Sequence, residues 1–288
     1  MQIKANFKKE LLAFRRTKTL LVLTCVFIGL AVFNPLMLKG LDVIVTVANE
    51  AIEITVEQPQ DNEIDPDVAV LSALPPFTHA SRGVESIISD LPTIGLIVFL
   101  LMINRFAGGE QKRRSIIIPR SSGLRPLGYL LPKFVVYPLA VLALSVAAVF
   151  AAAMVSIPLT EVNDLVYSRV LLSGILLGVY LMMYVCFHLT IGTATGKAGM
   201  SAAICIAVSI ILPGIFAALS VGTDGDFIAY NPFALSTMAI LSVREVPDTT
   251  ELMVTAAAAF AIMLAVYFVA LFAQNAKRID NSGNEKLI

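Results

Sequence analysis

Charge is scarce in this sequence. Only 15% of its 288 residues are Asp, Glu, Lys or Arg, whereas 57% are hydrophobic. A soluble domain carries about 25% charged residues, because water must solvate its surface. The few charges gather in short connecting segments, and long stretches have none. This pattern excludes an ordinary soluble domain and is typical of a protein embedded in a bilayer.

Cysteine and histidine are sparse as well. Cys25, Cys186 and Cys205 all lie in apolar stretches, which argues against a disulfide framework. With only His79 and His188, a His-Glu-x-x-His zinc site is impossible. We expect His188, the one histidine in an apolar run, to be a hydrogen-bonded packing residue rather than a proton relay.

Motifs for catalysis are also missing. The segment 192–197 has three residues between its glycines, where a phosphate-binding loop has four. No serine lies in a Gly-x-Ser-x-Gly frame. Acids and bases at membrane depth, which an ion-driven carrier needs, are not evident. We therefore expect no enzyme activity and no cofactor in this chain. An intramembrane enzyme ranks third among the functions considered, after a transport protein and a membrane anchor or binding protein.

Apolar runs long enough to cross a membrane are abundant. A helix needs about 20 residues to span the ~30 Å hydrocarbon core. Five runs qualify without a single charge: 19–38, 134–160, 170–196, 198–223 and 252–276. A shorter run, 91–104, is expected to span because Asp90 and Arg105 can snorkel at its ends. The sequence predicts an all-α polytopic membrane protein with six transmembrane helices over residues 19–288.

The distribution of cations predicts the orientation. If the first loop lies outside, the inner segments hold 17 of the 21 cations and only 4 of the 21 acids. Cationic inner loops are the rule in membrane proteins. We therefore predict that both termini are cytoplasmic.

Two segments outside the spans have recognisable patterns. Residues 1–18 place Ile3, Phe7, Leu11 and Phe14 at helical spacing, which predicts an amphipathic helix lying flat in the inner interface. The alternative is a basic tail that only orients the first span. The outer loop 39–90 is acidic over 50–67, and its alternating segments 44–47 and 52–57 predict a small hairpin. This loop is either a solvated connector or a partner-binding surface.

The inner loop 108–133 is too long for a tight turn, and its isoleucines favour a short helix that a partner covers. Packing against lipid headgroups is the alternative. The residues expected to contact the partner are Glu110, Arg113, Arg114, Ile116 and Ile117.

The same loop resembles a family pattern. Glu110, Ser115, the run 116–118, Pro119-Arg120 and Lys133 are similar to the Glu-x-x-Gly-Thr, apolar run, Pro-x-x-Arg, Gly-Lys pattern of type-2 ABC transporter permeases. It departs from that pattern because Arg114 stands where the glycine should be, Arg120 follows the proline directly, and Pro132 precedes the lysine.

The resemblance implies a function. It implies an exporter permease in a bacterial cell (inner) membrane that pairs with a second copy or a homologous permease. Its loop 108–133 would be a coupling helix that docks on separate cytoplasmic ABC ATPase subunits. It also implies short re-entrant helices before the last span, at Asn231-Pro232. No nucleic acid is expected as a partner. The alternative function is a membrane anchor or immunity-type binding protein that uses the acidic outer loop.

Small residues mark two further positions. Pro213-Gly214 lies near the middle of the fifth predicted span, in the run 198–223, and predicts a kink or hinge. Gly174 and Gly178 permit close helix approach, either between subunits or within one chain.

Cysteine labelling tests the predicted orientation. With Asp61→Cys, an impermeant reagent should label intact cells, whereas with Ser122→Cys it should not. The background cysteines Cys25, Cys186 and Cys205 should stay unlabelled because they lie in apolar runs. The reverse pattern would show that the orientation is inverted.

Overall fold

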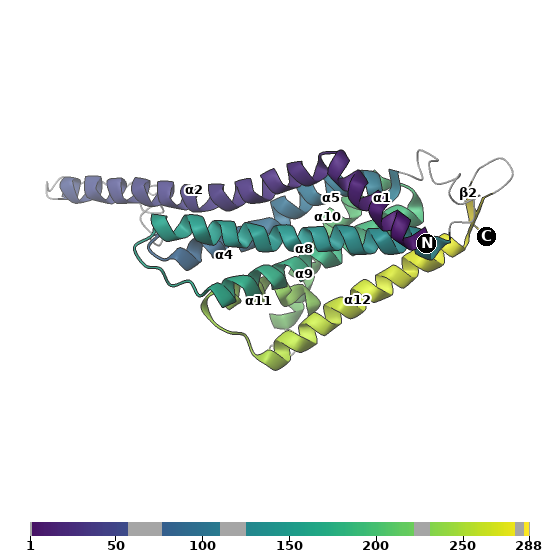
Figure 1. Ribbon diagram of the computed structural model, residues 1–288. Helices are drawn as coiled ribbons and strands as arrows, with labels where there is room; N and C mark the ends of the chain where they lie inside the picture. The colour runs from purple at the N-terminus through teal and green to yellow at the C-terminus, as the bar shows by residue number, and fades with distance from the viewer. Residues whose placement is uncertain (1, 57–76, 110–124, 222–230, 280–284, 288) are drawn as a thin grey trace.

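The computed structural model describes residues 2–56, 77–109, 125–221, 231–279 and 285–287 (Figure 1). Its α-helices are α1 (Gln2–Arg16), α2 (Thr19–Val56), α4 (Ala80–Asp90), α5 (Leu96–Asn104), α8 (Pro126–Leu159), α9 (Tyr167–Thr195), α10 (Ala198–Val221), α11 (Leu235–Arg244) and α12 (Thr249–Asn275). Two π-helical segments, η1 (Leu91–Gly95) and η2 (Arg105–Gly109), and a 3₁₀ turn, η3 (Pro232–Ala234), complete the helical part.

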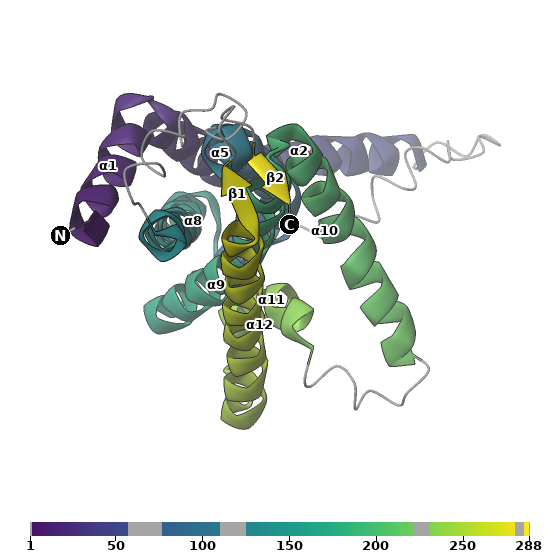
Figure 2. The same cartoon turned by 90° about the vertical axis from the view of Figure 1, so that its right-hand side faces the viewer.

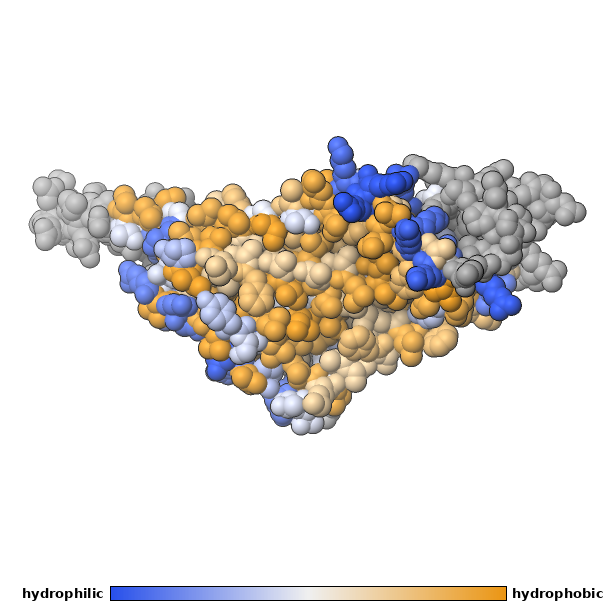
Figure 3. All heavy atoms as spheres, in the orientation of Figure 1, coloured by the Kyte–Doolittle hydropathy of each residue, from blue (hydrophilic) through white to orange (hydrophobic). Residues whose placement is uncertain are grey.

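Six helices in the described part of the chain are long and apolar enough to cross a membrane. They are the Thr19–Val47 part of α2, the continuous helix Ala80–Gly109, α8, α9, the Gly199–Phe216 part of α10, and α12. Figure 3 shows a hydrophobic belt across the molecule, with hydrophilic residues gathered toward its ends. The chain is therefore a helical multi-pass membrane protein, as predicted.

α9 is the central helix of the bundle. It packs against α8, α10, α11 and α12, and most of its side chains are buried. α10 and α12 diverge from each other, with α11 between them (Figure 2). α1 and β2 both lie at one end of the bundle, called here the α1 end, and α4 begins toward the opposite end, called here the α4 end (Figure 1).

Small residues set the contact between α8 and α9. A Cβ built at Gly178 would lie 2.4 Å from Leu142 Cδ1 and 3.1 Å from Leu142 Cα. At Gly174 it would lie 3.1 Å from the Cα of Val146. Gly174 and Gly178 therefore serve close packing within one chain, which was one of the two predicted alternatives.

The outer hairpin predicted for 44–47 and 52–57 is wrong. α2 continues without interruption as far as Val56, well beyond the residues that a membrane crossing requires. Alternating β-branched residues in this stretch suit a strand by propensity, but the helix that enters it from the preceding span is simply extended. The only strands among the described residues are β1 (Lys277–Ile279) and β2 (Glu285–Leu287), a short antiparallel pair beyond α12.

The second span is longer than predicted, and Asp90 does not mark its end. The helix begins at Ala80, so Asp90 lies ten residues inside it rather than at its boundary. Asn34 Nδ2 on α2 donates a 2.6 Å hydrogen bond to Asp90 Oδ2. Pro92 has no N–H to continue the α-helical ladder, and the helix widens into η1, where Leu96 N–H reaches the Leu91 carbonyl. A partner, not snorkelling, accommodates this carboxylate.

A glycine substitution tests the close approach of α8 and α9. Gly178→Ala should lower the free energy of unfolding by about 1–3 kcal/mol, because the added methyl group meets Leu142 and must push the two helices apart. The matched control is Gly29→Ala, where a Cβ meets nothing within 4 Å and α2 should gain slightly in stability. Denaturation of both variants in detergent measures the difference. Equal stability would contradict the contact.

Candidate functional site

A buried ion pair joins three elements at the α1 end. Lys133 Nζ on α8 lies 3.5 Å from Glu10 Oε1 on α1 and donates a 2.8 Å hydrogen bond to the Phe106 carbonyl in η2. The other carboxylate oxygen, Oε2, accepts a 2.7 Å hydrogen bond from the Tyr137 hydroxyl. Glu10 and Lys133 are 3% and 0% exposed. We call Glu10, Phe106, Lys133 and Tyr137 the junction.

Aromatic rings enclose the junction. Tyr137 stacks on Phe106 at a centroid distance of 5.1 Å and meets Phe14 edge-on at 5.5 Å. The Lys133 ammonium lies 5.0 Å from the centroid of the Tyr129 ring, which adds a cation–π contact. Water has little access to these groups, so the charges interact more strongly than they would at a surface.

Helical spacing places both sides of the junction. On α8, Tyr129, Lys133 and Tyr137 are four residues apart and share one face. On α1, Asn6 and Glu10 are likewise four apart, and Asn6 Nδ2 donates a 2.9 Å hydrogen bond to the Gly128 carbonyl of α8. Polar contacts from one face of α1 therefore attach this helix to α8.

The face of α1 that packs on the protein differs from the predicted apolar face. Of the four apolar residues singled out, Phe14 is buried, whereas Ile3 is 39% and Leu11 60% exposed. Asn6 and Glu10 occupy the protein side instead, because their hydrogen-bond partners lie on α8. The outward apolar residues remain available to lipid, and a seat in the interface stays a prediction.

Lys133 does not belong to the inner loop, as the predicted range 108–133 had it. α8 begins at Pro126, and Lys133 lies two turns inside it and is fully buried. The predicted partner contacts Glu110, Arg113, Arg114, Ile116 and Ile117 lie outside the described residues, and so does Ser115. In the sequence, Phe106 of the junction precedes that segment and Lys133 follows it.

The buried charge pair constrains the elements that supply its partners. Both charges have hydrogen-bonding partners, which limits the cost of taking them out of water. The Lys133 ammonium also donates to the Phe106 carbonyl of η2, so this buried charge has a second polar partner. The junction therefore binds α1, the end of the second span and the start of the third span to one another.

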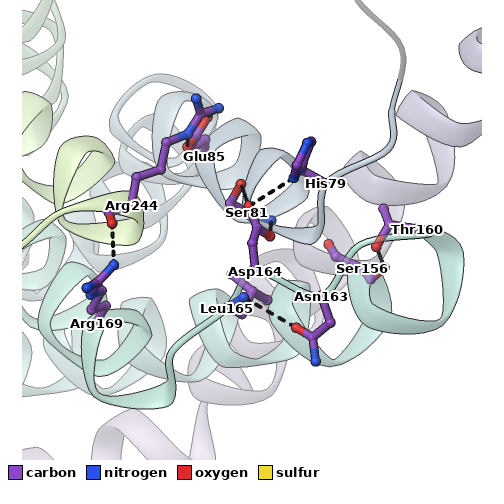
Figure 4. A network of polar contacts seen from close by, with 10 residues as sticks. All are labelled: His79, Ser81, Glu85, Ser156, Thr160, Asn163, Asp164, Leu165, Arg169 and Arg244. Atoms are coloured by element: carbon purple, nitrogen blue, oxygen red, sulfur yellow. Dashed lines mark hydrogen bonds and ion pairs between the residues drawn. The ribbon is translucent and has the colours of Figure 1, made fainter.

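A second polar network connects helices at the α4 end (Figure 4). Ser81 donates two hydrogen bonds to Asp164, from its N–H at 2.9 Å and its hydroxyl at 2.7 Å. Arg244 at the end of α11 binds Glu85 of α4 through two guanidinium nitrogens, and Arg169 donates to the Arg244 carbonyl. α4, the connection between α8 and α9, α9 and α11 are thereby held together.

Asp164 is the centre of that network. Partial burial by itself would raise the pKa of Asp164, but the two hydrogen bonds from Ser81 outweigh it and hold the pKa below its usual value. His79 Nδ1 lies 3.4 Å from the same carboxylate. The carboxylate stands between the serine and the histidine, so this is not the arrangement of a serine hydrolase triad, in which the histidine contacts the serine.

His188 packs as predicted. It is fully buried on α9, and the Ser201 hydroxyl of α10 lies 2.8 Å from its Nδ1 and 2.6 Å from its carbonyl oxygen. The hydroxyl has one proton, which it donates to the carbonyl, so Nδ1 carries the proton of the second contact. These two bonds tie the start of α10 to α9.

The structure brings two other predicted residues together. Pro213 of α10 and Asn231 both line a hollow of about 260 Å³. Asn231 caps η3, because its side-chain oxygen accepts a 3.0 Å hydrogen bond from the Phe233 N–H, and Pro232 begins that turn. A Cβ at Gly214 would meet nothing within 4 Å. Hinge motion at Pro213 and Gly214, and re-entry at Asn231 and Pro232, remain predictions.

Comparison with known proteins does not assign a family. The sequence matches no protein-family model, and it matches no curated protein. The functional argument therefore depends on this chain's own residues and contacts.

A double substitution tests the junction. Glu10→Gln and Lys133→Met should each lower the free energy of unfolding by about 3–5 kcal/mol, because each leaves the other charge buried without its counterion. The double variant should recover most of that loss. Lys8→Met, at an exposed position on α1, is the control and should be neutral. Simple additivity in denaturation measurements would contradict the pairing.

Proposed function

We propose that this chain is the membrane-spanning permease subunit of a type-2 ABC exporter in a bacterial inner membrane. A separate cytoplasmic ATPase would hydrolyse ATP, and this chain would form the pathway together with a second copy or a homologous permease. In this assembly the α1 end faces the cytoplasm, since the sequence places 17 of its 21 cations there.

The junction is the observation that supports this proposal most directly. The segment 110–124, which carries the family-like pattern, emerges between Phe106 and Lys133. Those two residues, which flank the segment in the sequence, are joined by a 2.8 Å hydrogen bond, and Glu10 joins them to α1. A force applied to the segment would therefore act on three elements together rather than on a loose loop.

Packing offers a route for such a force. η2 and α8 both pack against α9, and α9 packs against α10, α11 and α12. A Cβ at Gly192 of α9 would lie 2.8 Å from the Ala107 Cβ in η2, so these backbones approach closely. Densely packed helices move as bodies, because their interfaces do not compress. A displacement of the junction would therefore also move α10 and α12, the two helices that diverge.

The lightly packed spans suit an assembly with a second permease. α10 and α12 expose many large apolar side chains, among them Ile210, Ile211, Phe260, Phe268 and Phe272. In a membrane these faces meet lipid or another subunit. The described residues leave ample surface on both helices for either.

Copurification tests the ABC assignment. Protein purified gently from its native membrane should carry an ATPase subunit, and Ile117→Asp combined with Arg114→Glu should release it, because an apolar anchor and a charge contact would both be lost. Membrane insertion should be unaffected. Glu161→Gln, in the connection between α8 and α9 at the α4 end, is the control and should retain the ATPase.

One outcome would overturn the assignment. Wild-type protein that carries no nucleotide-binding subunit, and that these substitutions leave unaltered, would favour the anchor or immunity-type binding protein. A partner bound through the acidic outer loop would then be the expected copurifying species.

A further inference from the structure

The hollow beside α11 has the composition of a binding site for a small organic molecule. It lies between α10, η3, α11 and the first turn of α12, and its volume is about 260 Å³. Its lining residues are Pro213, Phe216, Asn231, Phe233, Ala234, Ser236, Thr237, Met238, Leu241 and Glu251. Mostly apolar walls with a few polar groups are typical of ligand pockets.

The apolar wall is built and supported. Phe216 of α10 and Phe233 of η3 stack at a centroid distance of 5.3 Å, and the ring of Tyr184 on the central helix lies 6.1 Å from that of Phe233. The Asn231 cap holds the backbone of η3 in place. The aromatic wall is thus fixed before any ligand arrives, which lowers the entropic cost of binding.

Among the described residues, Glu251 is the only charged residue that lines the hollow. It lies in the first turn of α12, where the helix N-terminus favours a negative charge. Within the described residues no cation pairs with it. The connecting residues 222–230 contain neither lysine nor arginine, so that segment supplies no counterion either. A carboxylate without a counterion beside an apolar wall attracts a cation.

The hollow lies between two helices that diverge. α10 and α12 splay apart around α11 in Figure 2, and Leu241 of the lining is exposed. Ile211 and Ile215 of α10 and Met253 of α12, close in sequence to lining residues, are exposed as well. The helices that form the hollow therefore present an apolar surface, which favours an occupant with an apolar body.

We infer that this hollow binds a lipophilic organic cation, with the apolar body against Phe216 and Phe233 and the positive charge beside Glu251. As a substrate site this inference depends on the proposed export function. The binding itself requires only this chain, so the two can fail separately.

Calorimetry on the full-length protein in nanodiscs of zwitterionic lipid tests the inference, with empty nanodiscs subtracted. The probes are octyltrimethylammonium and octanesulfonate, which share a tail and differ in the sign of their charge. The ammonium should bind saturably and the sulfonate should not. Equal binding of both probes, or no saturable binding of the ammonium, would overturn the inference.

Two substitutions separate the charge from the cavity. Glu251→Gln should weaken ammonium binding by about tenfold or more, because it removes the carboxylate and keeps the side-chain volume. Glu245→Gln, at an exposed position outside the lining, is the matched control and should bind as the wild type. Thr237→Phe keeps the carboxylate but fills the hollow, and it should abolish binding even if the Glu251 variant does not fold. Unchanged affinity in Thr237→Phe would place the probe elsewhere.

The ATPase copurification distinguishes this inference from the proposed function. Ammonium binding without an attached ATPase would leave the site in place and remove its export role. An attached ATPase without ammonium binding would leave the permease assignment in place and refute the site.

Discussion

The ion pair between Glu10 and Lys133 is the constraint on which the α1 end of this protein depends. A charge inside an apolar bundle is tolerated only when its partners are placed correctly. Here the partners come from three elements, since Lys133 on α8 reaches the Phe106 carbonyl and Glu10 on α1 also accepts from Tyr137. None of these elements can shift alone without separating a buried charge from one of its partners. The pair therefore makes α1 part of the bundle rather than an attached tail.

The bundle divides into a dense half and an open half. α8 and α9 approach closely through Gly174 and Gly178, and η2 meets α9 at Gly192. The Asp164 and Glu85 contacts hold the α4 end of this half. α10 and α12 instead diverge, and they leave the hollow beside α11 between them. The described helices therefore form a densely packed half and a half whose spans expose large apolar side chains.

The predictions from the sequence that proved wrong did so for physical reasons. Residues 44–47 have the β-branched alternation of a strand, yet α2 runs through them, because an established helix is easily extended. Asp90 suggests a membrane boundary, but Asn34 supplies a partner within the span. The spacing of Tyr129, Lys133 and Tyr137, and the single acid on the basic α1, were signals of the junction. They were not decisive, because periodicity shows which residues share a face but not what that face contacts.

The sequence by itself determined the membrane class, the six spans and the asymmetry of charge, because apolar length and the placement of lysine and arginine are local properties of the chain. It also located the proline and asparagine that line the hollow, without showing that they meet. Only the tertiary structure decided which charges are buried together and which helices pack or diverge. Glu10 and Lys133 are 123 residues apart, and contacts across such a distance depend on how whole helices pack rather than on any local pattern.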